Sequence, residues 1–110
     1  MANVVTGITA DGTYDGFRII APSEGTIEVY GDFDGGTVTL EISTDGGTTW
    51  RNFQSRDATN TVTDVTWSAT EFKSVVPFPT GKYRFTLADS TSPSLKIDVN
   101  CLMMTSFDQV

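Results

Sequence analysis

Carboxylates are the most numerous residues of this chain that could do chemistry. The sequence has fourteen aspartates and glutamates, one cysteine and no histidine. Asp32 and Asp34 flank Phe33, and a hairpin would bring Asp45 close to them. Carboxylates at alternate positions can share a calcium ion, but no glutamate stands where an EF-hand loop places its twelfth residue. We therefore favour solvated turn aspartates, with Asp32 and Asp34 as the alternative metal candidates, and we expect no metal or cofactor.

Catalytic use of these groups would require a geometry that the sequence does not select. A glycosidase needs two carboxylates that face one cleft, and no spacing singles out two of the fourteen. Cys101 has no histidine to serve as its base, and it follows Leu95, Ile97 and Val99 at a period of two. We therefore expect an inward-facing thiol, no disulfide framework and no enzymatic activity.

The most informative stretch is 43–50, which reads Ser-Thr-Asp-Gly-Gly-Thr-Thr-Trp. The residues before it, 37–43, alternate strictly between apolar and polar side chains, which indicates a half-buried strand. Asp45 is followed by two glycines that tolerate positive φ, and its side chain can accept hydrogen bonds from nearby backbone N–H groups. The stretch therefore predicts a hairpin turn. Trp50 opens the returning strand, and we expect its ring to enter the core.

The same stretch matches the pattern Ser-x-Asp-x-Gly-x-Thr-Trp at every fixed position. These positions are Ser43, Asp45, Gly47, Thr49 and Trp50. The pattern resembles the Asp-box, a hairpin turn that is repeated in sialidase propellers and found singly in other β-proteins. The resemblance implies a structural turn and no chemistry. A chain of 110 residues with one such turn cannot form a propeller of ~40-residue blades, which argues against a glycosidase of that type.

The charge balance limits the classes of partner. Seven basic residues against fourteen acidic ones give a net charge of −7, and the pI is about 4.2. The basic residues never cluster along the sequence, so we expect neither nucleic acid nor an anionic membrane as a partner. No apolar run approaches the ~20 residues of a spanning helix. The first residues lack the charged start and apolar core of a signal peptide, so we expect synthesis in a cytoplasm without secretion by the usual route.

Short alternating runs separated by glycine and proline turns dominate the rest of the chain. The clearest runs cover 26–30, 37–43, 82–87 and 94–101. A rigid turn is expected at 77–81, which holds two prolines and a glycine, and no window has the 3.6-residue period of a helix. The sequence therefore predicts one all-β domain over 1–110. Its expected fold is an antiparallel β-sandwich or small jelly roll of seven to nine short strands.

The aromatic residues offer a second type of site. Two tryptophans, together with Tyr14, Tyr30 and Tyr83, could form a platform on which sugar rings stack. Trp50 and Trp67 both stand at strand positions that we expect to face inward. Core packing is therefore favoured over sugar binding for these rings.

The carboxyl end departs from the alternation of the last strand. Leu102, Met103 and Met104 are apolar in both phases, and Phe107 follows them. Apolar residues in both phases indicate that both faces of a segment are covered. Methionines make adaptable contacts. We therefore expect an extended arm at 102–110 that docks on another subunit, with coverage by a loop of the same chain as the alternative.

A short, acidic, cysteine-poor sandwich that is rich in threonine and glycine resembles the small structural proteins of tailed-bacteriophage virions. These include head decoration proteins and small tail or fibre domains. The resemblance rests on residues 36–53 and on the general character of the rest. It implies a non-enzymatic virion protein, assembled in the host cytoplasm as a homo-oligomer, that binds the major capsid protein on the particle surface. The alternative is a carbohydrate-binding or host-recognition module, which needs exposed aromatics or a calcium-bound loop.

Overall fold

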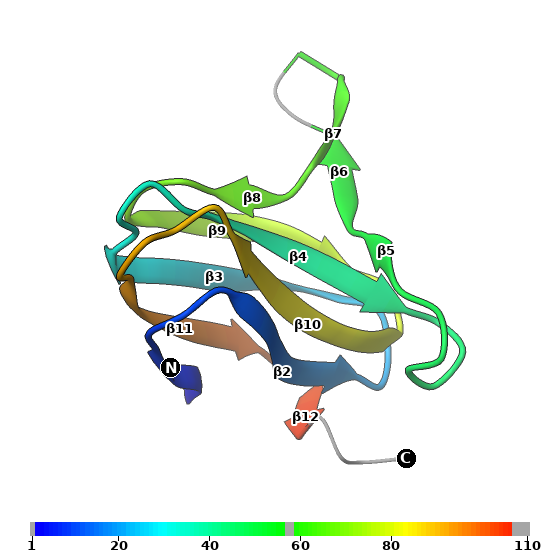
Figure 1. Cartoon of the computed structure of the whole chain (residues 1–110). Coiled ribbons are helices and arrows are strands. Elements are labelled where there is room, and N and C mark those ends of the chain that lie inside the picture. Colours follow the sequence, from blue (N-terminus) through cyan, green and yellow to red (C-terminus); the bar gives the residue numbers. More distant parts are fainter. Residues whose placement is uncertain (1, 57–58, 107–110) are drawn as a thin grey trace.

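Two antiparallel sheets pack face to face in the computed structural model, which describes residues 2–56 and 59–106 (Figure 1). The four-stranded sheet has the order β1-β11-β3-β9. Its strands are β1 (Ala2–Ile8), β11 (Ser94–Cys101), β3 (Ser23–Asp32) and β9 (Glu71–Phe78). In the six-stranded sheet, the order is β12-β2-β10-β4-β5, and β8 also pairs with β4. Its strands are β2 (Gly12–Ile19), β4 (Thr37–Ser43), β5 (Arg51–Asn52), β8 (Thr66–Trp67), β10 (Gly81–Ala88) and β12 (Met104–Ser106).

The predicted all-β antiparallel sandwich is confirmed. The described residues form twelve strands, more than the expected seven to nine, and seven of them have seven to ten residues each. The remaining strands have two or three residues and are too short to give an alternating signal. Two of them, β6 (Gln54–Arg56) and β7 (Val62–Asp64), form a hairpin that stands away from the sandwich (Figure 1). The described chain contains no helix that could cross a membrane.

The core lies between the sheets and follows the alternation of the long strands. Tyr83, Phe85 and Leu87 of β10 are buried, as the sequence predicted. The Phe17 and Tyr83 rings stack with centroids 4.9 Å apart, and Phe78 meets both edge-on at 5.4 and 5.3 Å. Aromatic pairs in these geometries contribute about 0.5–1.5 kcal/mol each beyond their buried area. Rings from both sheets therefore lock the two layers together.

The proline segment differs from the turn expected at 77–81. Strand β9 continues through Pro77 to Phe78, whose side chain is 1% exposed. A proline has no N–H to donate to a neighbouring strand. It is tolerated there because β9 is an edge strand, whose outer side has no neighbouring strand to bond. Burial raises the pKa of Tyr83, so its phenol stays neutral and donates a hydrogen bond to the Pro79 carbonyl oxygen at 2.6 Å. The turn is therefore shorter than predicted, and a hydrogen bond from the buried Tyr83 side chain holds it in place.

Candidate functional site

The turn after β4 is held by the side chains of Ser43 and Asp45. Ser43 Oγ donates to Asp45 Oδ1 at 2.7 Å and accepts the Gly47 N–H at 2.8 Å. The same carboxylate oxygen accepts the backbone N–H groups of Thr48 at 3.1 Å and Thr49 at 2.8 Å. These bonds, with that from the Thr49 backbone the largest contributor, hold the pKa of Asp45 well below its usual range. The turn therefore depends on the ionised form of Asp45.

Stability should depend on pH through this one carboxylate. Because the pKa of Asp45 is lower in the folded protein, its contribution is fully present above the unfolded value of about 4 and is lost as pH falls through the folded value. We expect the Tm of the wild type to exceed that of Asp45→Asn at neutral pH. The gap should narrow between pH ~5 and ~2, as followed by circular dichroism. Glu24→Gln, which removes an exposed carboxylate outside the turn, is the control; a constant gap would contradict the assignment.

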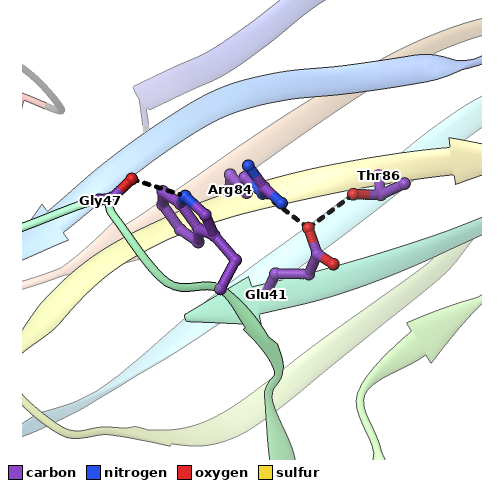
Figure 2. A network of polar contacts seen from close by, with 5 residues as sticks. Glu41, Gly47, Arg84 and Thr86 are labelled. Carbon is purple, nitrogen blue, oxygen red and sulfur yellow. Dashed lines mark hydrogen bonds and ion pairs between the residues drawn. The ribbon is translucent and has the colours of Figure 1, made fainter. Parts of the chain in front are cut away.

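Trp50 lies outside the core, so the expectation that the hairpin buries its ring is wrong. Its indole Nε1–H donates to the Gly47 carbonyl oxygen at 3.1 Å, and the Arg84 Cζ lies 4.3 Å from the ring centroid. Arg84 belongs to the outer face of β10, where its Nε is 2.6 Å from Glu41 Oε1 (Figure 2). Strand β5 begins only after Trp50, so no ladder sets the direction of that side chain. The core position of this segment is taken by Phe53 instead.

The outer face of the six-stranded sheet is polar, and its polar residues stand directly opposite one another on neighbouring strands. Arg84 stands opposite Glu41 on one side and Asp15 on the other. Thr86 Oγ1 donates to the same Glu41 oxygen at 2.8 Å (Figure 2). The next row along the strands consists of four threonines: Thr13, Thr86, Thr39 and Thr66. Since Glu41 already binds both Arg84 and Thr86, this face offers hydrogen-bonding groups rather than an acid–base pair.

The metal candidate Asp32 is engaged within its own loop, and Asp34 is engaged by the backbone of a distant loop. Asp32 Oδ1 accepts the Asp34 N–H at 3.0 Å, and Asp34 Oδ2 accepts the Ser92 N–H at 2.7 Å. Asp45 lies beyond the far end of β4, which spans roughly 20 Å, so the expected approach through the hairpin is wrong. The described residues contain no group of three or more histidine, cysteine, aspartate or glutamate side chains placed to hold a metal.

The aromatic candidates do not form one platform. Trp67 and Tyr83 lie in the core, as expected. Tyr14 and Tyr30 are half-buried and belong to different sheets, on β2 and β3 respectively. Only Trp50 joins the polar outer face described above. A sugar-binding site would use either Trp50 with its polar neighbours or Phe72 of β9, which is 48% exposed.

Two of the four large apolar side chains that are exposed in the described part of the chain lie at the end of the sandwich next to β12, whereas Val62 of β7 and Phe72 of β9 lie elsewhere. Ile20 is 51% exposed and Leu102 is 91% exposed. The Ile20 N–H donates to the Met103 carbonyl oxygen at 3.0 Å, which places the two turns side by side. A hollow beside Leu102 and a second one among the prolines share Glu24. We call the five exposed apolar residues of this region the end surface: Ile20, Pro22, Pro77, Pro79 and Leu102.

The predicted contacts of the carboxyl-terminal arm divide between two roles. Strand β12 pairs with β2, with Met104 opposite Ile19, and Met104 packs against the core. Met103 is half-buried, whereas Leu102 projects from the turn between β11 and β12. Phe107 lies outside the described residues. Met104 therefore belongs to the fold of its own chain, and Leu102 is the exposed residue of this segment.

Cys101 is half-buried, packs against the core and lies with Sγ 2.8 Å from Ser23 Oγ. This agrees with the expected inward-facing thiol.

No family model matches this chain, and neither a curated protein nor a solved structure does. Function is therefore inferred from the fold and from the chemistry of the surface.

Proposed function

We propose that this chain is a non-enzymatic structural protein of a tailed-bacteriophage virion, of the head decoration or tail-associated type. The observation that carries the proposal is the end surface, where Leu102 is 91% exposed beside Ile20 at 51%. Contiguous apolar patches on a soluble protein mark sites of interaction with other proteins. The proposed partner is the major capsid protein or a second copy of this chain.

The energetics suit attachment in many copies. Burial of a leucine or isoleucine side chain contributes about 1.5–3 kcal/mol relative to its exposed state. Two such residues with a rim of prolines make a weak individual contact. When several copies are linked to one another and bind the same lattice, their total affinity for that lattice is higher than that of one copy. After the first copy has bound, the others bind at a high effective concentration. Attachment in many copies therefore suits a small apolar contact of this kind.

The acidic groups that we considered for chemistry are used for structure instead. Asp45 accepts backbone N–H groups within its turn, Asp34 accepts the Ser92 N–H from a distant loop, and Glu41 is paired with Arg84. A catalytic carboxylate requires a cleft and a partner group at a suitable distance. This supports a binding role over an enzymatic one.

A carbohydrate-binding or host-recognition module is the second candidate, and the placement of Trp50 favours it. Its ring lies on the polar outer face of the six-stranded sheet, against the Arg84 guanidinium. Half-exposed aromatic rings among hydrogen-bonding groups suit sugar recognition. The two candidates use different residues, so variants of the end surface test the first and variants beside Trp50 test the second.

The first candidate predicts that the end surface controls association. The test is the double variant Ile20→Thr with Leu102→Ser. If the partner is a second copy, the variant should lose self-association as measured by light scattering. If the partner is the capsid protein, it should no longer co-sediment with particles of the phage or prophage that encodes the chain. Its Tm should stay within about 4 °C of the wild type, because exposed substitutions rarely change stability by more than about 0.5 kcal/mol each. Deletion of 102–110 is a poorer test, because it also removes β12.

The matched control is Val62→Thr. It removes a 47% exposed apolar side chain from the β6–β7 hairpin, away from the end surface. This variant should associate as the wild type does. The proposal is wrong if the double variant associates normally, or if mass spectrometry fails to find the chain in purified particles.

A further inference from the structure

Three turns cross from one sheet to the other at the end of the sandwich that carries the end surface. They are 102–103 between β11 and β12, 20–22 between β2 and β3, and 79–80 between β9 and β10. Because β3 lies between β11 and β9, and β2 between β12 and β10, the turn 20–22 lies between the other two. We call these three turns the row of turns. It has Leu102 at one side and Pro79 at the other.

The two sides of the row have opposite shapes. Leu102 projects from its turn and is 91% exposed. At the other side lies a hollow of about 490 Å³, the proline hollow, which is lined by Pro22, Pro77, Pro79, the buried Phe78, Ser23 and Glu24. Pockets of about 300–1,000 Å³ hold drug-sized ligands, so this hollow has room for an aliphatic side chain. One surface therefore carries both a projecting leucine and an apolar hollow that can receive one.

Two copies of such a surface fit each other by a two-fold rotation. In a symmetric dimer the same surface is used twice, so a projection of each copy meets the hollow of the other. An axis in the plane of contact that crosses the central turn, from one sheet to the other, exchanges the two sides of the row. Leu102 of each copy then faces the proline hollow of the other, and the exposed Ile20 lies near the axis. A different protein would need its own hollow and projection at the same spacing, whereas a second copy has both.

The charges of the chain also favour contact at this end. A net charge of −7 makes two copies repel each other. At the opposite end, the loops 9–11, 33–36 and 89–93 hold three aspartates and no basic residue. The row of turns itself contains no charged residue, and both signs occur beside it: Arg18, Lys82, Glu24 and the ionised Asp45. Two copies therefore meet less repulsion here than at the acidic end.

We propose that two copies of this chain join end to end across a two-fold axis, with Leu102 of each copy in the proline hollow of the other. The inference rests on the proposed function, because it assigns one partner and one geometry to the end surface. In such a dimer the two acidic ends point away from each other. The outer faces of both sheets remain exposed in each copy.

Glu24 reports on the orientation of the axis. It lines both the proline hollow and the hollow beside Leu102, so it lies between the two sides of the row, where the axis crosses. The two Glu24 carboxylates of a dimer therefore approach each other. Glu24→Gln should tighten the dimer about twofold to fivefold at low salt, because it removes this repulsion. An axis along the row would instead bring Glu24 to the other sheet of the partner, where Arg18 lies, and the same variant would weaken the dimer.

The first measurement is sedimentation equilibrium of the full chain between about 10 μM and about 1 mM, a range that suits a small, transient contact. The apparent mass should rise from one chain toward two and stop there, because each copy uses its surface once. Leu102→Ser and Pro79→Gln should each weaken the dimer at least about tenfold, since each affects both leucine contacts. Phe72→Thr removes a 48% exposed aromatic ring at the far end of β9 and should leave the dimer unchanged.

A mixture of two variants tests whether the contact is reciprocal. Leu102→Ser keeps the proline hollow, and Pro79→Gln keeps the projecting leucine. A mixed pair therefore restores one of the two leucine contacts. An equimolar mixture should associate more strongly than either variant alone and more weakly than the wild type. Circular dichroism should show that both variants are folded, because Tyr83 bonds to a backbone carbonyl that glutamine at position 79 retains.

Four results would overturn the inference. They are a wild type that stays monomeric at about 1 mM, growth beyond two chains, a mixture that associates no better than its components, and a weaker dimer for Glu24→Gln. Co-sedimentation with particles separates this inference from the proposed function. If the wild type is monomeric but the variant Ile20→Thr with Leu102→Ser loses particle binding, the dimer is wrong and the end surface binds another virion protein. If that variant keeps both particle binding and self-association, both proposals are wrong.

Discussion

Replacing Trp67 by alanine is expected to lower the free energy of unfolding by about 3–5 kcal/mol, the usual cost of emptying a buried aromatic site. Its side chain is 1% exposed and packs near Phe85, with ring centroids 6.3 Å apart. The two-residue strand β8 pairs with β4 alone, so few backbone contacts would compensate for the cavity. Because small domains have only about 5–15 kcal/mol of stability, the loss should be evident in a urea titration monitored by circular dichroism.

Trp50→Ala is the matched control, because it deletes the same atoms from a half-buried position. It removes the hydrogen bond to the Gly47 carbonyl and the contact with Arg84. Interactions of these kinds contribute about 1–2 kcal/mol together. Equal losses for the two tryptophan variants would show that the ring of Trp50 is as important to the fold as a core residue, contrary to its observed position.

Gly31→Ala is expected to cost about 3 kcal/mol or more, since it combines backbone strain with overpacking. Gly31 has φ of 121°, which side-chain-bearing residues rarely adopt. An added Cβ would collide with the Ser94 carbonyl oxygen and lie 3.2 Å from Leu95 Cα. Both neighbours are backbone atoms of β11, so relief would require the central strands of the four-stranded sheet to separate. The same urea titration measures the loss.

Gly7→Ala isolates the contribution of the backbone angle. Gly7 has φ of 69°, but no atom lies within 4 Å of a Cβ built there. Only the left-handed conformation is penalised, at about 1–2 kcal/mol. If Gly31→Ala were no more destabilising than Gly7→Ala, the close approach of β3 to β11 would not be the reason for a glycine at position 31.

The sequence by itself determined the fold class and the inward face of the long strands. The alternation in 37–43, 82–87 and 94–101 correctly identified core residues, because a period of two is a local property of an extended chain. The hydrogen bonds of the 43–50 turn are equally local. Asp45 reaches partners no more than four residues away, so their residue types and spacing were enough to predict a turn.

Tertiary structure alone decided the positions that depend on distant strands. Trp50 follows a turn and precedes a two-residue strand, and its ring lies against Arg84, far along the chain, as well as bonding to the nearby Gly47 carbonyl. Met104 packs against the core because β12 pairs with β2, which no alternation at 102–104 could indicate. The opposition of Arg18 and Lys82 likewise arises from the register of two strands. A one-residue change of register moves every side chain to the other face, so such placements follow from packing between strands and not from local pattern.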